Sequence, residues 1–368
     1  MDESVVTSWL TNWLGQIGWW IAIGVVIAAG LRTLYANPKT QKIKVMLQLV
    51  TLYARYWVWW LLSWSIWHLS VDGQVFYWWV AVLSLLYLYM NWVEPHRLRV
   101  QYRQIALPDN RQVPAQSLSP LRLAVIGDIH VGIFSTKHRL ERLVNQLNRL
   151  DVDAILCVGD WLYHPGADLI GQMLIFKALN KPCYSVLSQA DVEQLQAIDR
   201  QQGSGNYLLA NERLTQVLAT LGIQVIDDQA LYLGGIRLVG LTESVKLAQP
   251  PRESGHPVII ATHDIKQLKV HSHALDRVGS HVLVIAGQTH GGQVNLPFLT
   301  PILVKAMTGN ASVAGLFTHH HHNANQPKQV PSYQSWTTTG IGMTGLPFRL
   351  FCPPTIDVLT IQVTADKS

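Results

Sequence analysis

Cysteine is scarce in this chain of 368 residues, which contains only Cys157, Cys183 and Cys352. The three residues are far apart and odd in number, so they define neither a disulfide framework nor a cysteine-rich zinc site. Cys157 and Cys183 fall within apolar runs of strand length, where a free cysteine packs as a small buried hydrophobe. We therefore expect these cysteines to be structural.

Concentrated basic charge is also lacking. The formal net charge is +5, and no long run of Lys and Arg is interleaved with aromatic residues. Proteins that bind nucleic acids usually carry such a basic stripe. Nucleic acid is therefore excluded as the first partner to consider.

Charged side chains are nearly absent from three stretches in the first quarter of the chain. Residues 9–31 and 75–93 contain none, and residues 45–69 contain only Arg55. About 20 apolar residues in a helix span the hydrocarbon core of a bilayer. We therefore predict three transmembrane helices over these ranges, within a membrane region of residues 1–94.

Tryptophan is distributed as unevenly as charge, since 12 of the 14 lie before residue 93. Several lie near the ends of the three stretches, as do aromatic side chains at the interface between lipid and water. A cleavable signal peptide fits the first stretch poorly, because Asp2 and Glu3 stand where basic residues would be needed.

The connecting segments predict an orientation. Four basic residues lie in residues 32–44 and three in residues 94–103, whereas the turn around Gly73 has no Lys or Arg. By the positive-inside rule, the first connection and everything after residue 93 are cytoplasmic. The expected protein is thus a multi-pass protein of the inner (cytoplasmic) membrane, with the lipid bilayer as a partner. Arg55 is either an intramembrane functional charge or a residue that reaches the interface because its helix begins late.

Four later apolar runs of strand length each end in aspartate or histidine. Residues 121–126, 154–158, 258–261 and 281–286 are followed by Asp128 and His130, by Asp160, by His263 and Asp264, and by Gln288 and His290. In open α/β sheets, ligands bind beyond the carboxyl ends of the strands. Carboxylates and imidazoles that converge there predict a metal site.

The remaining pattern is that of a mixed α/β domain over residues 120–368, joined to the membrane region by a linker with an extended lead-in over residues 95–119. Apolar residues at helical spacing predict an amphipathic helix over residues 140–150, which makes one strand–helix–strand unit with the first two runs. Residues 207–221 are also expected to be helical. Further short strands are expected over residues 181–187, 223–226, 230–233, 236–240 and 356–363.

Taken together, the ordered motifs at residues 127–130, 159–160, 263 and 287–293 resemble those of the calcineurin-like metallophosphoesterases. The resemblance is to the bacterial membrane-anchored branch, which includes phosphodiesterases and is similar to UDP-2,3-diacylglucosamine hydrolases of lipid A synthesis. The glycine-rich residues 340–349 also look like that branch. The resemblance covers roughly residues 95–365 and implies a four-layer αββα sandwich that holds two divalent metal ions.

The resemblance assigns the first metal ion to four residues that are all present: Asp128, His130, Asp160 and His290. Asp160 would bridge to a second ion, for which His263 would be a nitrogen ligand. The family pattern does not distinguish Mn, Fe, Zn and Mg. One ion is therefore expected, and a second depends on positions where this chain departs from the family.

Three departures affect the second ion and the proton donor. Gln189 stands where the family has Asn, and its amide oxygen can still act as a ligand after a shift. Gln288 stands where the family has His and is a weaker donor. Ala190 replaces the His that would serve as general acid or stabilise the transition state. Losing a general acid or base typically costs about 10²–10⁴ in rate.

Two functions therefore remain open. The first is a membrane-anchored phosphoesterase that hydrolyses a phosphodiester or pyrophosphate through metal-activated water, with Asp160 and His263 as catalytic residues. Its substrate would be a phosphorylated small molecule or a lipid-linked molecule. The second is a weak or inactive pseudoenzyme that acts as a membrane binding or partner protein, suggested by the three departures. Full activity would require another residue, such as Asp191 or Asp264, to replace what is missing.

Four consecutive histidines, His319 to His322, also admit two interpretations. They form a metal-binding cluster or a polar exposed loop, and the polar residues that follow favour the loop. His271 and His273 are expected at the surface.

Overall fold

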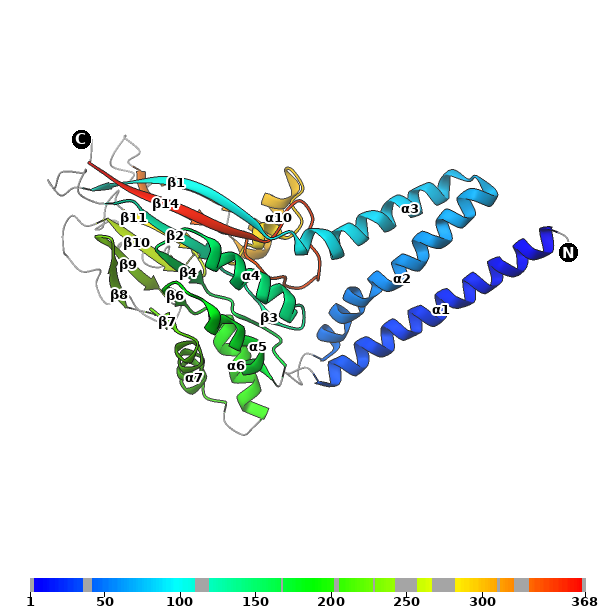
Figure 1. The fold of residues 1–368 in the computed structure, drawn as a ribbon, viewed down its shortest axis with the longest axis horizontal. Helices are drawn as coiled ribbons and strands as arrows, with labels where there is room; N and C mark the ends of the chain where they lie inside the picture. Colours follow the sequence, from blue (N-terminus) through cyan, green and yellow to red (C-terminus); the bar gives the residue numbers. More distant parts are fainter. Residues whose placement is uncertain are drawn as a thin grey trace.

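The structure is a computed structural model that describes residues 3–35, 42–109, 119–166, 168–201, 205–227, 229–241, 257–266, 282–309, 312–320 and 331–365. Three long helices extend from one end of a domain built on two β-sheets (Figure 1). The mixed α/β architecture expected for the later part of the chain is therefore confirmed.

The three N-terminal helices are α1 (Glu3–Tyr35), α2 (Lys42–Asp72) and α3 (Val75–Leu88). α3 continues through a π-helical turn (Tyr89–Val93) and a 3₁₀ turn (Glu94–His96). Among the described residues, two helical stretches are long and apolar enough to cross a membrane, Val6–Thr33 and Val75–His96. α2 does not meet this criterion, so a third span remains a prediction.

Arg55 lies on α2 beside aromatic rings. Its guanidinium carbon is 4.8 Å from the ring centroid of Trp92 and 5.2 Å from that of Tyr56. Trp92 belongs to the turn that ends the α3 segment, next to the sheet domain. This contact places Arg55 near the domain end of the helices, as expected if it reaches the interface.

The first sheet has six strands in the order β1-β14-β2-β4-β6-β7. These are β1 (Arg99–Asp109), β14 (Thr355–Ala365), β2 (Leu121–Ile126), β4 (Ala154–Val158), β6 (Cys183–Val186) and β7 (Ile223–Val225). β14 runs antiparallel to β2, and all other neighbours are parallel. β1 occupies much of the segment expected to be a linker, so the sheet begins at Arg99, before residue 120.

The second sheet also has six strands, in the order β12-β13-β11-β10-β9-β8. These are β12 (Gly315–His320), β13 (Pro331–Thr337), β11 (Val282–Ala286), β10 (Val258–Thr262), β9 (Ile236–Leu241) and β8 (Ala230–Leu233). The two sheets share one core, in which Leu123 and Leu156 belong to the same cluster as Ile259 and Leu283. Strands covered on both faces read as continuous apolar runs, which explains why they were visible in the sequence.

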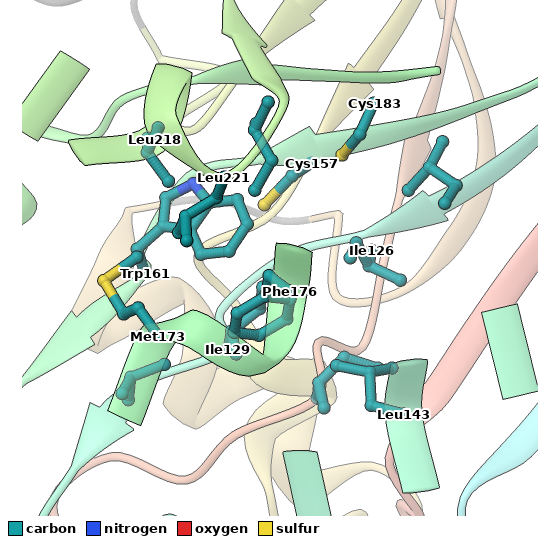
Figure 2. Packing of buried hydrophobic residues seen from close by; sticks show 14 of the residues in the cluster. Ile126, Ile129, Leu143, Cys157, Trp161, Met173, Phe176, Cys183, Leu218 and Leu221 are labelled. Atoms are coloured by element: carbon teal, nitrogen blue, oxygen red, sulfur yellow. The ribbon is translucent and has the colours of Figure 1, made fainter. Parts of the chain in front are cut away.

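Helices cover the outer face of the first sheet (Figure 1). They are α4 (Lys137–Arg149), α5 (Leu169–Met173), α6 (Gln189–Gln201) and α7 (Tyr207–Thr220), with a 3₁₀ turn at Leu174–Ala178. Figure 2 shows the core beneath them, where the rings of Trp161 and Phe176 pack edge to face with centroids 5.2 Å apart. Cys157 and Cys183 are buried in this cluster, as expected. The fourth layer of the expected sandwich stays a prediction, because residues 242–256 and 267–281 lie outside the described residues.

The first two helices attach to the end of the sandwich where the strands deliver their polar residues. A small apolar cluster joins Val45 and Leu49 of α2 to Phe134 and Tyr163 of the sheet domain. Tyr163 belongs to β5 (Leu162–Tyr163), which pairs with β3 (Val131–Gly132). The Gln48 Nε2 donates to the Tyr163 hydroxyl at 2.9 Å. The candidate site therefore lies beside the junction with the helices.

Candidate metal centre

The four residues predicted to share one metal ion lie together. Asp128 and His130 follow β2, Asp160 follows β4, and His290 begins a 3₁₀ turn (His290–Gly292) after β11. All four are buried, and one ligand atom from each lies within 4.8 Å of the others. The site thus forms at the carboxyl ends of strands from both sheets, as the sequence pattern indicates.

The backbone at these positions is unusual. The φ angles of Asp128, His130, Asp160 and His290 are +48°, +53°, +55° and +51°. Residues other than glycine rarely adopt the left-handed region, and they persist there only when surrounding contacts hold them. Two such contacts are the hydrogen bonds from the Asp128 N–H to the Gly159 carbonyl at 2.9 Å and from the His130 N–H to the Asp160 carbonyl at 3.0 Å.

The side-chain distances are those of a shared ligand set. The Nε2 atoms of His130 and His290 are 3.0 Å apart, and His290 Nε2 is 3.3 Å from the Asp128 Oδ1. His130 Nε2 is 3.6 Å from the Asp160 Oδ2. Two ring nitrogens at 3.0 Å fit a single ion, because metal–nitrogen bonds are about 2.0–2.1 Å long.

Orphaned polar atoms support the same conclusion. The Asp128 Oδ2 is buried without a hydrogen-bond partner among the described residues, and so is the Nδ1 of both His130 and His290. A buried polar group without a partner is costly. The Asp128 oxygen that faces His290 and His263 is Oδ1. This buried donor set of carboxylates and imidazoles suits a divalent metal.

His263 joins the cluster from β10. Its Nδ1 donates to the Val158 carbonyl at 2.8 Å, which fixes the ring and turns Nε2 toward the carboxylates. That Nε2 is 3.4 Å from the Asp160 Oδ2 and 4.0 Å from the Asp128 Oδ1. The structure therefore places His263 where a fifth metal ligand or a cationic group would act on the same centre.

Burial and neighbouring charges shift the pKa values of the histidines and aspartates in the cluster in different directions. Burial lowers the pKa of His130 to about 4 and lowers that of His290 well below its usual value, so both rings are neutral near pH 7. Burial alone would raise the pKa of Asp160 and lower that of His263, but their mutual attraction reverses both shifts. Burial raises the pKa of Asp128 to about 7. Neutral imidazoles are the form that a metal ion requires.

The positions that depart from the family have different surroundings. The Gln288 N–H donates to the Asp128 Oδ1 at 3.2 Å, and its Nε2 donates to the Asp264 Oδ2 at 3.0 Å. Gln288 thus lies against the cluster. Gln189 and Ala190 are exposed, and the Gln189 amide donates to Glu193 at 2.6 Å. The structure does not bring Gln189 or Ala190 into the buried cluster.

Ser188 and Asp191 form a supporting layer that the motifs did not reveal. The Ser188 hydroxyl donates to the Asp160 Oδ1. The buried Asp191 accepts from the Leu162 N–H at 2.9 Å and from the Ser188 N–H at 3.1 Å. Burial, with the nearby Asp160, raises the pKa of Asp191 to about 7. Asp191 therefore positions Ser188, whose hydroxyl contacts Asp160.

Arg349 is a second residue that the sequence analysis did not single out. It is completely buried. Its guanidinium donates to the carbonyls of Thr339, Gly342 and Cys352 at 3.1, 2.6 and 3.1 Å. These bonds hold residues 339–342 against Asp128. The repeated glycines of residues 340–345 were the available signal, because close backbone approach needs them.

Tyr163 and His164 were also missed. The Tyr163 ring packs edge-on against His130, with centroids 5.1 Å apart. His164 is buried with a φ of +45°, and its N–H donates to the Gln194 side chain at 2.8 Å. Burial lowers the pKa of His164 to about 4. In the sequence, the only indication that either residue belongs to the site is that it closely follows Asp160 along the chain.

The prediction of a loop over His319 to His322 is wrong for the first two of these residues. His319 and His320 end strand β12. The His319 ring stacks on Tyr333 with centroids 4.4 Å apart, and its Nε2 is hydrogen-bonded to the Ser335 hydroxyl at 2.7 Å. His321, His322, His271 and His273 lie outside the described residues.

A buried set of carboxylates and imidazoles at the ends of strands from two facing sheets is typical of the metal site of a metal-dependent hydrolase. Comparison with known sequences leads to the same class, since residues 121–299 match the family model for calcineurin-like phosphoesterases. Residues 121–299 therefore carry a calcineurin-like metallophosphoesterase domain.

Curated relatives agree with this assignment. A Helicobacter pylori (strain ATCC 700392 / 26695) protein named "Uncharacterized metallophosphoesterase" is 24% identical over 276 residues, which cover 71% of this chain and 65% of the relative. The chain thus spans just under two thirds of that relative. A Danio rerio protein named "Transmembrane protein with metallophosphoesterase domain" is 26% identical over 64% of this chain and 52% of its own length. A Bacillus subtilis (strain 168) protein, "Uncharacterized metallophosphoesterase YkuE", is 24% identical over 76% of this chain and 90% of its own length.

Proposed function

We propose that this protein is a membrane-anchored, metal-dependent phosphoesterase that hydrolyses a phosphodiester or pyrophosphate bond. The observation that carries the proposal is the buried cluster of Asp128, His130, Asp160 and His290, whose ligand atoms lie within 4.8 Å of one another. Ordinary folding does not favour such a cluster, because it places uncompensated polar atoms in the interior.

The four residues would hold a divalent ion, with Asp128 and Asp160 as the anionic ligands. When bound, such an ion polarises phosphoryl oxygens and lowers the pKa of water. His263 faces both carboxylates, with its Nε2 3.4 Å from the Asp160 Oδ2, and Asp160 raises the pKa of this ring above its usual value against the effect of burial. It is therefore placed to offset negative charge that develops on a phosphoryl group. Ser188 and Asp191 keep Asp160 in position.

The membrane is the proposed environment of the substrate. α1 and α3 contain the two stretches that are apolar enough to span a bilayer. The metal centre lies beside the junction with α1 and α2, through Tyr163 and the cluster around it. A substrate whose phosphoryl group sits near the membrane surface, such as a lipid-linked phosphodiester, fits this placement. The domain is proposed to be cytoplasmic at the inner membrane, from the basic residues of the connections.

A pseudoenzyme is the competing proposal, and Ala190 is its main support. The exposed Ala190 has no proton to donate, and Gln189 donates to Glu193 at the surface. A protein with one weakly held ion and no general acid would bind a phosphorylated ligand without turning it over.

Hydrolysis assays separate the two proposals. The full chain in detergent or nanodiscs would be tested against bis(p-nitrophenyl) phosphate and a nucleotide-sugar pyrophosphate with added Mn²⁺. The Asp160→Ala variant should lose the activity. Asp151→Ala is the matched control, because Asp151 is highly exposed and pairs with Arg122 at the surface, where ion pairs contribute little. Activity that is absent from the wild type, or equal in Asp160→Ala, would favour the pseudoenzyme.

A further inference from the structure

Helix α10 (Leu299–Thr308) presents an apolar face to the surroundings. Leu299, Ile302, Leu303 and Met307 are all exposed, and Met307 reaches 84% exposure. These positions recur at helical spacing, so they share one side of the helix. Phe298, which precedes the helix, is 89% exposed. Large contiguous apolar patches of this kind usually mark an interaction surface.

The opposite side of α10 is fixed to the metal centre. Thr300 and Val304 are buried. A Cβ added to Gly292 would lie 2.4 Å from the Thr300 Cγ2, so the helix touches the backbone of the turn that begins with His290. The Thr300 hydroxyl also donates to the Val294 carbonyl at 2.7 Å. α10 therefore cannot shift without moving the turn that carries His290.

The chain leading into α10 is connected to the end of α3. The Asn295 N–H donates to the Leu350 carbonyl at 2.8 Å. The neighbouring Arg349 N–H donates to the Met90 carbonyl at 3.1 Å, in the turn that continues α3. Figure 1 shows α10 beside this end of α3, where the helices meet the sandwich. Phe351, 62% exposed, belongs to the same connecting segment.

We propose that α10 is an interfacial helix that lies in the headgroup region of the bilayer and holds the metal centre against its surface. This inference rests on the membrane placement in the proposed function. The occupant of the apolar face is lipid, because α10 lies beside the end of α3 and its lead-in is hydrogen-bonded to that end through residues 349–350, and α3 contains a stretch apolar enough to span a bilayer. Lys305 is exposed on the same helix and extends the surface with a positive charge suited to anionic headgroups. A phosphoryl group at headgroup depth would then be the substrate group within reach of His290.

The position of α10 can be measured directly by site-specific labelling. The native cysteines are all buried, so an introduced cysteine on an exposed site is the reactive one. Full-length Met307→Cys would carry an environment-sensitive fluorophore in liposomes of phosphatidylethanolamine and phosphatidylglycerol. Gln216→Cys on α7 is the matched control, because it is exposed on a helix of the same domain, away from α10 (Figure 1). Carbonate extraction would establish independently that the chain is membrane-embedded.

The expected result is opposite quenching at the two sites. Lipids with a quencher near the headgroup should quench the Met307→Cys label at least about twofold more than the Gln216→Cys label. Aqueous iodide should do the reverse. A chain that resists carbonate extraction but whose Met307→Cys label is quenched freely by iodide would overturn the interfacial helix and leave the anchoring intact. Shielding from both quenchers would put protein on this face, and loss of the chain on extraction would remove the membrane placement itself; either result overturns the inference.

Discussion

Asp128 is enclosed by the backbone of two glycines. A Cβ added to Gly340 would lie 2.7 Å from the Asp128 Cβ, and one added to Gly287 would lie 2.9 Å from the Asp128 Oδ2. The carboxylate is thus enclosed by backbone, and only glycine permits this approach. The geometry of one metal ligand therefore depends on residues that make no bond to a metal.

Replacing Gly340 by alanine tests this dependence. Gly340 and Gly345 both have a φ of +68°, so alanine costs roughly 1–2 kcal/mol of backbone strain at either site. A Cβ at Gly345 meets nothing within 4 Å, whereas at Gly340 it collides with Asp128. We expect Gly340→Ala to lower Mn²⁺ affinity at least about tenfold beyond Gly345→Ala, measured by calorimetry. Equal affinities in the two variants would show that the enclosure of Asp128 is irrelevant to binding.

The protonation of Asp128 predicts how metal affinity depends on pH. Burial raises its pKa to about 7, so below pH 7 an incoming ion must displace a proton. His130, with a pKa of about 4, is already neutral there and releases none. Affinity should therefore rise with pH below 7, by about tenfold per unit for each proton displaced. Titrations at pH 6 in buffers of different ionisation enthalpy should report close to one proton released from Asp128, and a flat affinity between pH 5.5 and 7 would contradict the assignment.

At the scale of residues, the sequence predicted the metal ligands better than the residues that hold those ligands in place. Asp128, His130, Asp160, His263 and His290 were found because each follows an apolar run of strand length. Ser188 and Arg349 were not, and Asp191 was named only as a replacement for a missing group, because their supporting roles arise from hydrogen bonds between atoms brought close only by folding. Short motifs carry no information about such contacts.

Among the strands, some were likewise predictable from the sequence and others were not. Strands buried on both faces, such as β2, β4 and β11, were predicted within one residue because they are continuous apolar runs. β1 was taken for a linker with an extended lead-in, because it is an edge strand rich in Arg and Gln and is specified by its pairing with β14. β12 and β13 lie beside residues outside the described ones, and their mixed composition gave no periodic signal.

The contact between α2 and β5 is the element-level feature that joins the helices to the metal centre. The Tyr163 hydroxyl accepts from the Gln48 Nε2 and from the Gly345 N–H, each at 2.9 Å. Tyr163→Phe would leave two donors unpaired, the buried Gln48 amide and the partly buried Gly345 N–H, at a cost of about 1–3 kcal/mol. We expect it to lower the midpoint of thermal unfolding in nanodiscs more than the control Tyr53→Phe. Among the described residues, the Tyr53 hydroxyl accepts a hydrogen bond from Arg32, and Arg32 keeps its bond to the Ile133 carbonyl when that hydroxyl is removed. A larger effect of Tyr53→Phe would show that the helices attach elsewhere.

For the whole molecule, the charges of the connections predict how it sits in the membrane. Lys39, Lys42 and Lys44 precede or begin α2, whereas the turn at Gly73 between α2 and α3 has no Lys or Arg. A reporter fused to the C-terminus should behave as cytoplasmic, and one inserted at Gly73 as external. The opposite pattern would place the phosphoesterase domain, and its substrate, on the outer side of the membrane.

The central claim is that Asp128, His130, Asp160 and His290 hold a divalent ion, and the metal content of the purified chain tests it most directly. The full-length protein would be equilibrated with Mn²⁺, freed of unbound ions and analysed by mass spectrometry for bound metal, beside Asp160→Ala, His290→Ala and the surface control Asp151→Ala. We expect at least one ion per chain in the wild type and in Asp151→Ala, and a loss of about tenfold or more in affinity in the two site variants. A wild-type chain that holds no divalent ion, or site variants that hold as much as the wild type, would contradict the account.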